Sequence, residues 1–142
     1  VCSRVLKGVF AAGTLDVLEG TKEDCMLTDY KSYRSKTKPR AISSFYRYQL
    51  LTYAWILRKS GYNVTRIRLV YVNAPIDGGI SEKTGKPLKS YPSEVTVLTE
   101  VIEEKDFEFI EGLLYLCHDS LEAVEKHPEL KHVIFHDPRL KE

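Results

Sequence analysis

Two aspartates and a lysine are the side chains in this sequence whose types and spacing best suit chemistry. Asp16 ends the stretch Gly-Thr-Leu-Asp, and Asp29 and Lys31 stand two residues apart further along the chain. Hard divalent cations prefer oxygen ligands, which two carboxylates and the backbone carbonyl of Tyr30 could supply. A neighbouring lysine could orient or deprotonate a water, or balance charge developing on a phosphate. The combination suits metal-assisted hydrolysis of a phosphodiester.

A predicted hairpin would position the acidic residues. Residues 5–18 are rich in Val, Leu, Phe and Ala and contain two glycines, which favours one long bent strand or two short ones. Residues 19–24 have the composition of a turn, and Cys25–Tyr33 is typical of the returning strand. The acidic residues therefore lie on two strands that we expect to pair.

The register of this hairpin decides whether the two aspartates meet. If Gly20 faces Cys25 across a four-residue loop, the same antiparallel register places Asp16 opposite Asp29. Lys31 then shares a strand face with Asp29, because alternate residues point to the same side. A slip of one residue would break the arrangement, so the register is itself a prediction.

A helix is predicted after the hairpin, over residues 42–60. Ser43 or Ser44 can cap its beginning. Gln49 and Tyr53 are one turn apart and border the apolar side of this helix, so both polar groups would lie at the edge of the core.

The second half of the chain predicts strands over residues 65–72 and 94–102, and an amphipathic helix over residues 105–126. The glycine- and proline-rich segment 73–92 between the strands predicts a long loop or mobile flap. On the predicted helix over residues 105–126, apolar residues recur every three or four positions and form a stripe that indicates the side facing the core. Its members are Phe107, Ile110, Leu114, Cys117, Leu121 and Val124. The order of elements predicts a mixed α/β domain with a central sheet.

Composition limits the class of protein. A chain of 142 residues with 43% hydrophobic and 29% charged residues fits one globular domain. No apolar run approaches the roughly 18 residues of a membrane span, so we expect no membrane partner. Three scattered cysteines argue against a disulfide framework and favour a reducing cytoplasm. The missing initiator Met predicts a piece of a longer protein.

Basic residues gather in two segments, although Lys and Arg total 21 against 20 for Asp and Glu. The first follows the strand that carries Asp29, and the second lies in the long loop. Either segment is a solvated charge run or a contact for phosphates. The first contains Arg34, Lys36, Lys38 and Arg40, and the second Lys83, Lys86 and Lys89.

Histidines and aromatic residues offer weaker signals. His132 and His136 are four apart, but they lack a convincing third ligand, and we interpret them as part of a surface tail. Tyr46, Tyr48 and Trp55 are interpreted as core and helix surface, with base stacking as the alternative for one of them.

The motifs Gly-x-x-Asp, Asp-x-Lys and Gln-x-x-x-Tyr, in this order, resemble the PD-(D/E)XK nuclease superfamily. The resemblance is nearest to its RecB-like branch, with phage-type exonucleases, and it spans about residues 5–72. It implies a restriction-endonuclease-like core, in which a central mixed β-sheet is flanked by helices, within one domain over residues 1–142. It also implies Mg²⁺ or Mn²⁺ as cofactor and single- or double-stranded DNA as partner.

Carried to this sequence, the resemblance implies that Asp16, Asp29 and the carbonyl of Tyr30 bind the metal and that Lys31 is the catalytic lysine. Gln49 and Tyr53 resemble the helix pair that positions the nucleophile, metal site or substrate phosphate. The basic segment from Arg34 to Arg40 would contact the nucleic acid. The list of implied site residues is Asp16, Asp29, Tyr30, Lys31, Gln49, Tyr53, Arg34, Lys36, Lys38 and Arg40.

The resemblance also sets the expected function and its alternatives. It implies an exonuclease of DNA recombination, repair or processing in the cytoplasm of a bacterial or phage-infected cell, with an organelle or the nucleus as alternatives. The family often adds an acidic residue or histidine on an upstream helix, which this sequence does not show. One alternative is therefore a non-cleaving nucleic-acid-binding or scaffold domain, and another is one module of a larger helicase–nuclease. An iron–sulfur cluster would need four cysteines.

Overall fold

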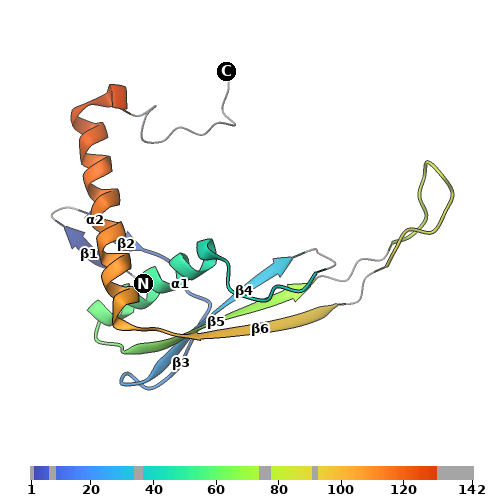
Figure 1. The fold of residues 1–142 in the computed structure, drawn as a ribbon, viewed down its shortest axis with the longest axis horizontal. Helices are drawn as coiled ribbons and strands as arrows, with labels where there is room; N and C mark the ends of the chain where they lie inside the picture. Colours follow the sequence, from blue (N-terminus) through green and yellow to red (C-terminus); the bar gives the residue numbers. More distant parts are fainter. Residues whose placement is uncertain (1, 7–8, 34–36, 74–77, 91–92, 131–142) are drawn as a thin grey trace.

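A computed structural model describes residues 2–6, 9–33, 37–73, 78–90 and 93–130 of the chain. Its helices lie on one side of a four-stranded sheet (Figure 1). The elements in chain order are β1 (Cys2–Leu6), β2 (Val9–Ala12), β3 (Val17–Gly20), β4 (Cys25–Tyr33), α1 (Ser44–Lys59), β5 (Val64–Asn73), β6 (Glu94–Val101), α2 (Glu104–Lys126) and the short 3-10 helix η1 (Pro128–Leu130).

The main sheet is mixed, with the strand order β3-β4-β5-β6. β4 and β5 are parallel and are connected through α1, whereas β3 and β6 pair antiparallel with their neighbours. Because a parallel pair needs a crossover, α1 returns along the sheet and begins near the ends of β4 and β5. The predicted α/β fold with a central mixed sheet and flanking helices is confirmed.

The segment before β3 differs from the prediction. In place of one strand or two over residues 5–18, β1 and β2 form a separate two-stranded antiparallel sheet that lies against α1 and α2. β3 also continues through Gly20, so the predicted turn over residues 19–24 begins too early. The loop itself is closed by Thr21, whose N–H donates to the carbonyl of Asp24 at 3.1 Å. The pairing of β3 with β4 thus extends to Gly20 and Cys25.

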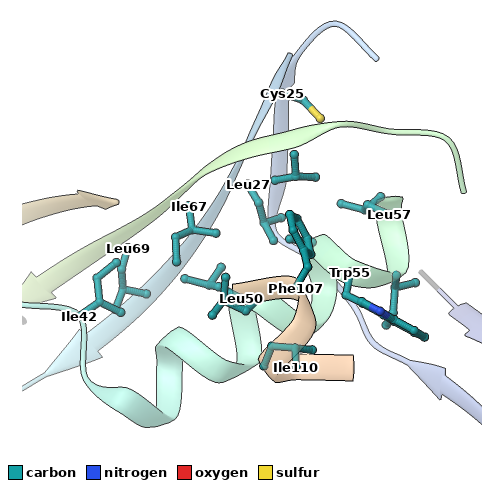
Figure 2. Packing of buried hydrophobic residues seen from close by; sticks show 14 of the residues in the cluster. Cys25, Leu27, Ile42, Leu50, Trp55, Leu57, Ile67, Leu69, Phe107 and Ile110 are labelled. Carbon is teal, nitrogen blue, oxygen red and sulfur yellow. The ribbon is translucent and has the colours of Figure 1, made fainter. Parts of the chain in front are cut away.

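The core lies between the sheet and α1, and the beginning of α2 closes it (Figure 2). Leu50 of α1 packs against Leu27 of β4 and Ile67 of β5, and all three are fully buried. Burying one such side chain stabilises the fold by about 1.5–3 kcal/mol. This layer holds α1 at a fixed height above β4, which places the polar side chains at its edge.

The apolar stripe on α2 is buried only at its beginning. Phe107 and Ile110 are buried, whereas Leu121 is 50% exposed and Cys117 is exposed. The predicted core side is therefore correct for the first turns and wrong beyond them. The physical reason is visible in Figure 1, in which α2 continues beyond the edge of the four-stranded sheet.

The ends of α1 and the long loop refine the prediction. α1 begins at Ser44, with Ser43 as N-cap but without a side-chain capping hydrogen bond. Of the long loop, residues 78–90 extend away from the sheet as a small hairpin with a bridge between Ile80 and Pro87 (Figure 1).

Candidate active site

β4 presents Asp29 and Lys31 on the face of the sheet that α1 covers. Leu27, two residues before Asp29, is fully buried in the core, so this alternation carries the polar pair onto the same face. The Asp29 residue is only 4% exposed. Its Oδ2 atom lies 2.7 Å from the Nζ atom of Lys31. A buried carboxylate is costly unless it is paired, and the lysine supplies the pairing charge.

Asp16 reaches the same part of β4 from the other strand. The predicted register is observed, since Gly20 is opposite Cys25 and Val17 is opposite Thr28. Asp16 immediately precedes β3, and its Oδ2 atom accepts a hydrogen bond of 2.9 Å from the backbone N–H of Tyr30. The structure therefore places the carboxylate of Asp16 beside Tyr30, the residue that follows Asp29 on β4.

The pKa of Lys31 is shifted by its surroundings. Burial alone would lower the pKa of its ammonium, but hydrogen bonding to Asp29 and the charges of Asp29, Asp16 and Tyr46 outweigh burial and raise the pKa above its ordinary value. Lys31 is therefore a cation at neutral pH in this arrangement.

Gln49 and Tyr53 form one hydrogen-bonded unit on α1. The amide nitrogen of Gln49 lies 3.1 Å from the hydroxyl oxygen of Tyr53, as expected for residues four apart on a helix. The Tyr53 ring also lies against Gly13, where an added Cβ would be only 2.2 Å from the ring Cε1 atom. Since Gly13 is three residues before Asp16, this contact ties the helix pair to the segment that carries the first carboxylate.

Tyr46 belongs to this region, although the sequence interpretation treated it as core or helix surface. The Nζ atom of Lys31 lies 5.2 Å from the centre of the Tyr46 ring, within the range of a cation–π contact. Tyr46 also packs edge-on against Tyr71 of β5, with ring centres 6.1 Å apart. Its position three residues before Gln49 places it on the same helix side, which is the sequence signal that could have found it.

The oxygen atoms of this region fit a hard divalent cation. Among the residues that the structure describes, the buried Oδ2 atom of Asp29 has no hydrogen-bond partner of ordinary geometry beyond its ion pair with Lys31. Asp16 is exposed, and its carboxylate lies next to Asp29 because it accepts a hydrogen bond from the backbone N–H of Tyr30. A divalent cation held by these carboxylates would share Asp29 with Lys31, and the carbonyl of Tyr30 stays a predicted third ligand.

The predicted nucleic-acid contacts are placed only in part. Arg34 and Lys36 lie outside the described residues. Lys38 forms an ion pair with Glu94 at the beginning of β6, and the hydrogen bond to this carboxylate raises the pKa of Lys38. Arg40 is exposed. For Lys38 a phosphate would have to compete with Glu94, and all four contacts stay predictions.

Two other features lie apart from these carboxylates. His118, Asp119 and Glu122 of α2 place their ligand atoms within 4.8 Å of one another, but both carboxylates are exposed and Glu122 pairs with Lys126 at 2.9 Å. A surface hollow of about 330 Å³ lies between α1 and α2. Neither contains Asp16, Asp29 or Lys31. His132 and His136 lie outside the described residues.

Fold and site together define an α/β domain with paired acids and a lysine beside a parallel strand pair. The family model described as the PD-(D/E)XK nuclease superfamily matches residues 5–128. The chain belongs to this superfamily. Membership implies nuclease activity on a nucleic acid, and nucleases of this superfamily generally use divalent metal ions.

The other comparisons add no relative. Neither the curated proteins nor the solved structures contain a match to this chain. Among the described residues, no helix is long and apolar enough to cross a membrane. The RecB-like branch, the kind of nucleic acid and the identity of the metal stay predictions.

Proposed function

We propose that this protein is a Mg²⁺- or Mn²⁺-dependent deoxyribonuclease of the RecB-like type that acts from a DNA end during recombination, repair or processing. The observation that carries the proposal is that Asp16, just before β3, meets the part of β4 that carries Asp29 and Lys31. One carboxylate is bonded to the N–H of Tyr30 at 2.9 Å, and the other is 2.7 Å from the lysine. The end preference and the branch rest on the resemblance of the motifs.

Asp16, Asp29 and the carbonyl of Tyr30 would hold the divalent cation. Bound there, the cation supplies positive charge to a phosphate and lowers the pKa of a water. The carboxylates fix where this charge lies, because Asp29 is held by the strand and Asp16 by the register of the hairpin. Charge that is positioned before the reaction begins accounts for a large part of the catalysis of phosphoryl transfer.

Lys31 would act as a cation beside the phosphate. Its ammonium lies 2.7 Å from the Asp29 carboxylate, so it is placed to balance negative charge that develops on the phosphate. A divalent cation that binds Asp29 would weaken the Lys31–Asp29 pair. The ammonium would then be available to a phosphate oxygen, with a donor geometry that the neighbouring Tyr46 ring helps to hold.

Gln49 and Tyr53 would position the phosphate or the attacking water. Their mutual hydrogen bond fixes the orientation of both side chains, and contact with Gly13 fixes the tyrosine ring. A fixed orientation matters because misplacement by about 1 Å can slow a reaction about 100-fold.

The test compares wild type with Asp29→Asn on 5′- and 3′-labelled single- and double-stranded DNA, with Mg²⁺, with Mn²⁺ and with EDTA. Asp119→Asn is the matched control, because it removes an acid of the surface cluster on α2. We expect metal-dependent cleavage by wild type and the control, and a loss of about 100- to 1,000-fold in Asp29→Asn. Circular dichroism checks that each variant is folded.

Cleavage that persists in EDTA, or in folded Asp29→Asn, would refute the metal mechanism. DNA binding without cleavage by wild type would favour the scaffold alternative. Cleavage that depends on fusion to a longer parent chain would favour a module of a helicase–nuclease.

A further inference from the structure

The beginning of α1 presents an exposed aromatic side chain beside the candidate active site. Phe45 is 75% exposed, the highest value among the large hydrophobic residues that the structure describes. Its ring is not isolated, since it packs edge-on against Tyr46 with ring centres 5.5 Å apart. An exposed, oriented phenylalanine loses little rotamer freedom when a second flat group stacks on it.

A continuous set of ring contacts joins Phe45 to Lys31. The Tyr46 ring contacts Phe45 on one side and the Lys31 ammonium, 5.2 Å from its centre, on another. Tyr46 also leans on Tyr71, which in turn packs against Tyr33 at 5.7 Å. Buried and half-buried tyrosines thus support the exposed ring from beneath, and the cation at the other end attracts a phosphate.

We propose that Phe45 is a stacking platform for one nucleobase of the strand whose phosphate lies at Asp16, Asp29 and Lys31. The inference rests on the proposed nuclease function and names its substrate class. A base inside a duplex has both faces covered by neighbouring pairs, so only an unpaired or terminal base offers a free face. The site therefore takes single-stranded DNA, or the unpaired end of a duplex.

The sequence neighbours of Phe45 at the start of α1 carry no negative charge. Ser43 and Ser44 are both exposed, and the first turn of α1 contains no acidic residue that would repel a phosphate. A phosphate and its base could therefore approach the helix start together. Base–aromatic stacking tolerates any sequence, because every base has a π-face.

The experiment measures binding of a single-stranded oligonucleotide by fluorescence anisotropy in Ca²⁺ and its cleavage in Mg²⁺. Phe45→Ala removes the platform, Phe45→Trp restores a ring, and Leu116→Ala removes a 62% exposed apolar side chain of α2 as the control. We expect Phe45→Ala to weaken binding about 5- to 150-fold, with Trp and the control close to wild type.

A series of single abasic sites identifies the stacked position. One abasic site should weaken wild-type binding by the same factor as Phe45→Ala and should cost the variant nothing more. Unchanged binding by Phe45→Ala, or equal abasic losses in both proteins at every position, would overturn the platform. Failure of wild type to cleave in Mg²⁺ would overturn the proposed nuclease function instead, and the binding series would still decide the platform.

Discussion

Gly13 is the residue at which a single methyl group tests the geometry of the site. A Cβ added there would lie 2.2 Å from Cε1 and 2.9 Å from Cζ of the Tyr53 ring. Gly13 is absent from the positive-φ glycines among the described residues, so alanine can adopt its backbone conformation. The conflict is therefore steric, and the ring of Tyr53 or the backbone at residue 13 must shift.

The expected cost follows from two opposing effects. Overpacking by one methyl group destabilises by about 1–3 kcal/mol. Gly→Ala restricts the unfolded chain and returns about 0.4–1 kcal/mol. These two effects leave a net loss of about 0–2.6 kcal/mol for Gly13→Ala. Weakening of the Gln49–Tyr53 hydrogen bond adds about 1 kcal/mol to this loss. Cleavage should fall by more than stability predicts, because the displaced pair no longer positions the phosphate.

Urea unfolding measures this loss, and cleavage of labelled single-stranded DNA measures the second effect. Gly112→Ala is the control, because no atom lies within 4 Å of its added Cβ and a helical glycine replaced by alanine should stabilise α2 by about 1 kcal/mol. In the double variant Gly13→Ala/Tyr53→Ala the steric cost should vanish. A Gly13→Ala protein as stable and active as wild type would refute the assigned contact, as would strict additivity in the double variant.

Three further predictions concern charge. In Asp29→Asn the pKa of Lys31 should fall, because burial then opposes the ammonium with less compensation, and NMR titration of the lysine would show it; an unchanged pKa would contradict the pairing. Arg47→Ala should destabilise the fold by about 1–3 kcal/mol in urea, because the buried Asp106 carboxylate, 3.0 Å from Arg47, loses its partner. Burial opposes the Asp106 carboxylate, but its hydrogen bond to the backbone of Glu103 and the nearby Arg47 lower its pKa below the ordinary value of 3.8. The stability that this carboxylate adds to the fold is therefore present above pH 3.8 and is lost as the pH falls through the lowered pKa. Acid unfolding should be less steep in Arg47→Ala. Asp16→Asn should weaken Mg²⁺ binding in calorimetry about 10-fold or more without unfolding the protein, and equal affinity would remove Asp16 from the ligand set.

Local patterns were sufficient for the elements that form the site. The composition of β4 predicted its bounds, and a four-residue loop was enough to predict its register with β3. Once the loop sets Gly20 opposite Cys25, every further pair follows, because directly opposed residues of an antiparallel ladder have a constant index sum. This is why the approach of Asp16 to Asp29 and Lys31 was predictable without coordinates.

Contacts between distant segments were not predictable in the same way. Gly13 lies between β2 and β3 and is close to the Tyr53 ring of α1, and the cation–π contact of Lys31 also joins β4 to α1. Periodicity shows which side of a helix is apolar, but it does not show how much sheet lies beneath it. For this reason the stripe on α2 was expected to be buried as far as Val124, whereas burial ends at Ile110.

The most direct test of the central hypothesis is the single-turnover cleavage rate of Lys31→Ala in Mg²⁺, measured together with its metal affinity. Lys126→Ala is the matched control, since Lys126 also pairs with a carboxylate, at 2.9 Å, but lies on α2. We predict that Lys31→Ala still binds the cation through Asp16 and Asp29 and cleaves DNA about 100- to 1,000-fold more slowly, while the control cleaves normally. A folded, metal-bound Lys31→Ala protein that cleaves at the wild-type rate would contradict the proposed mechanism.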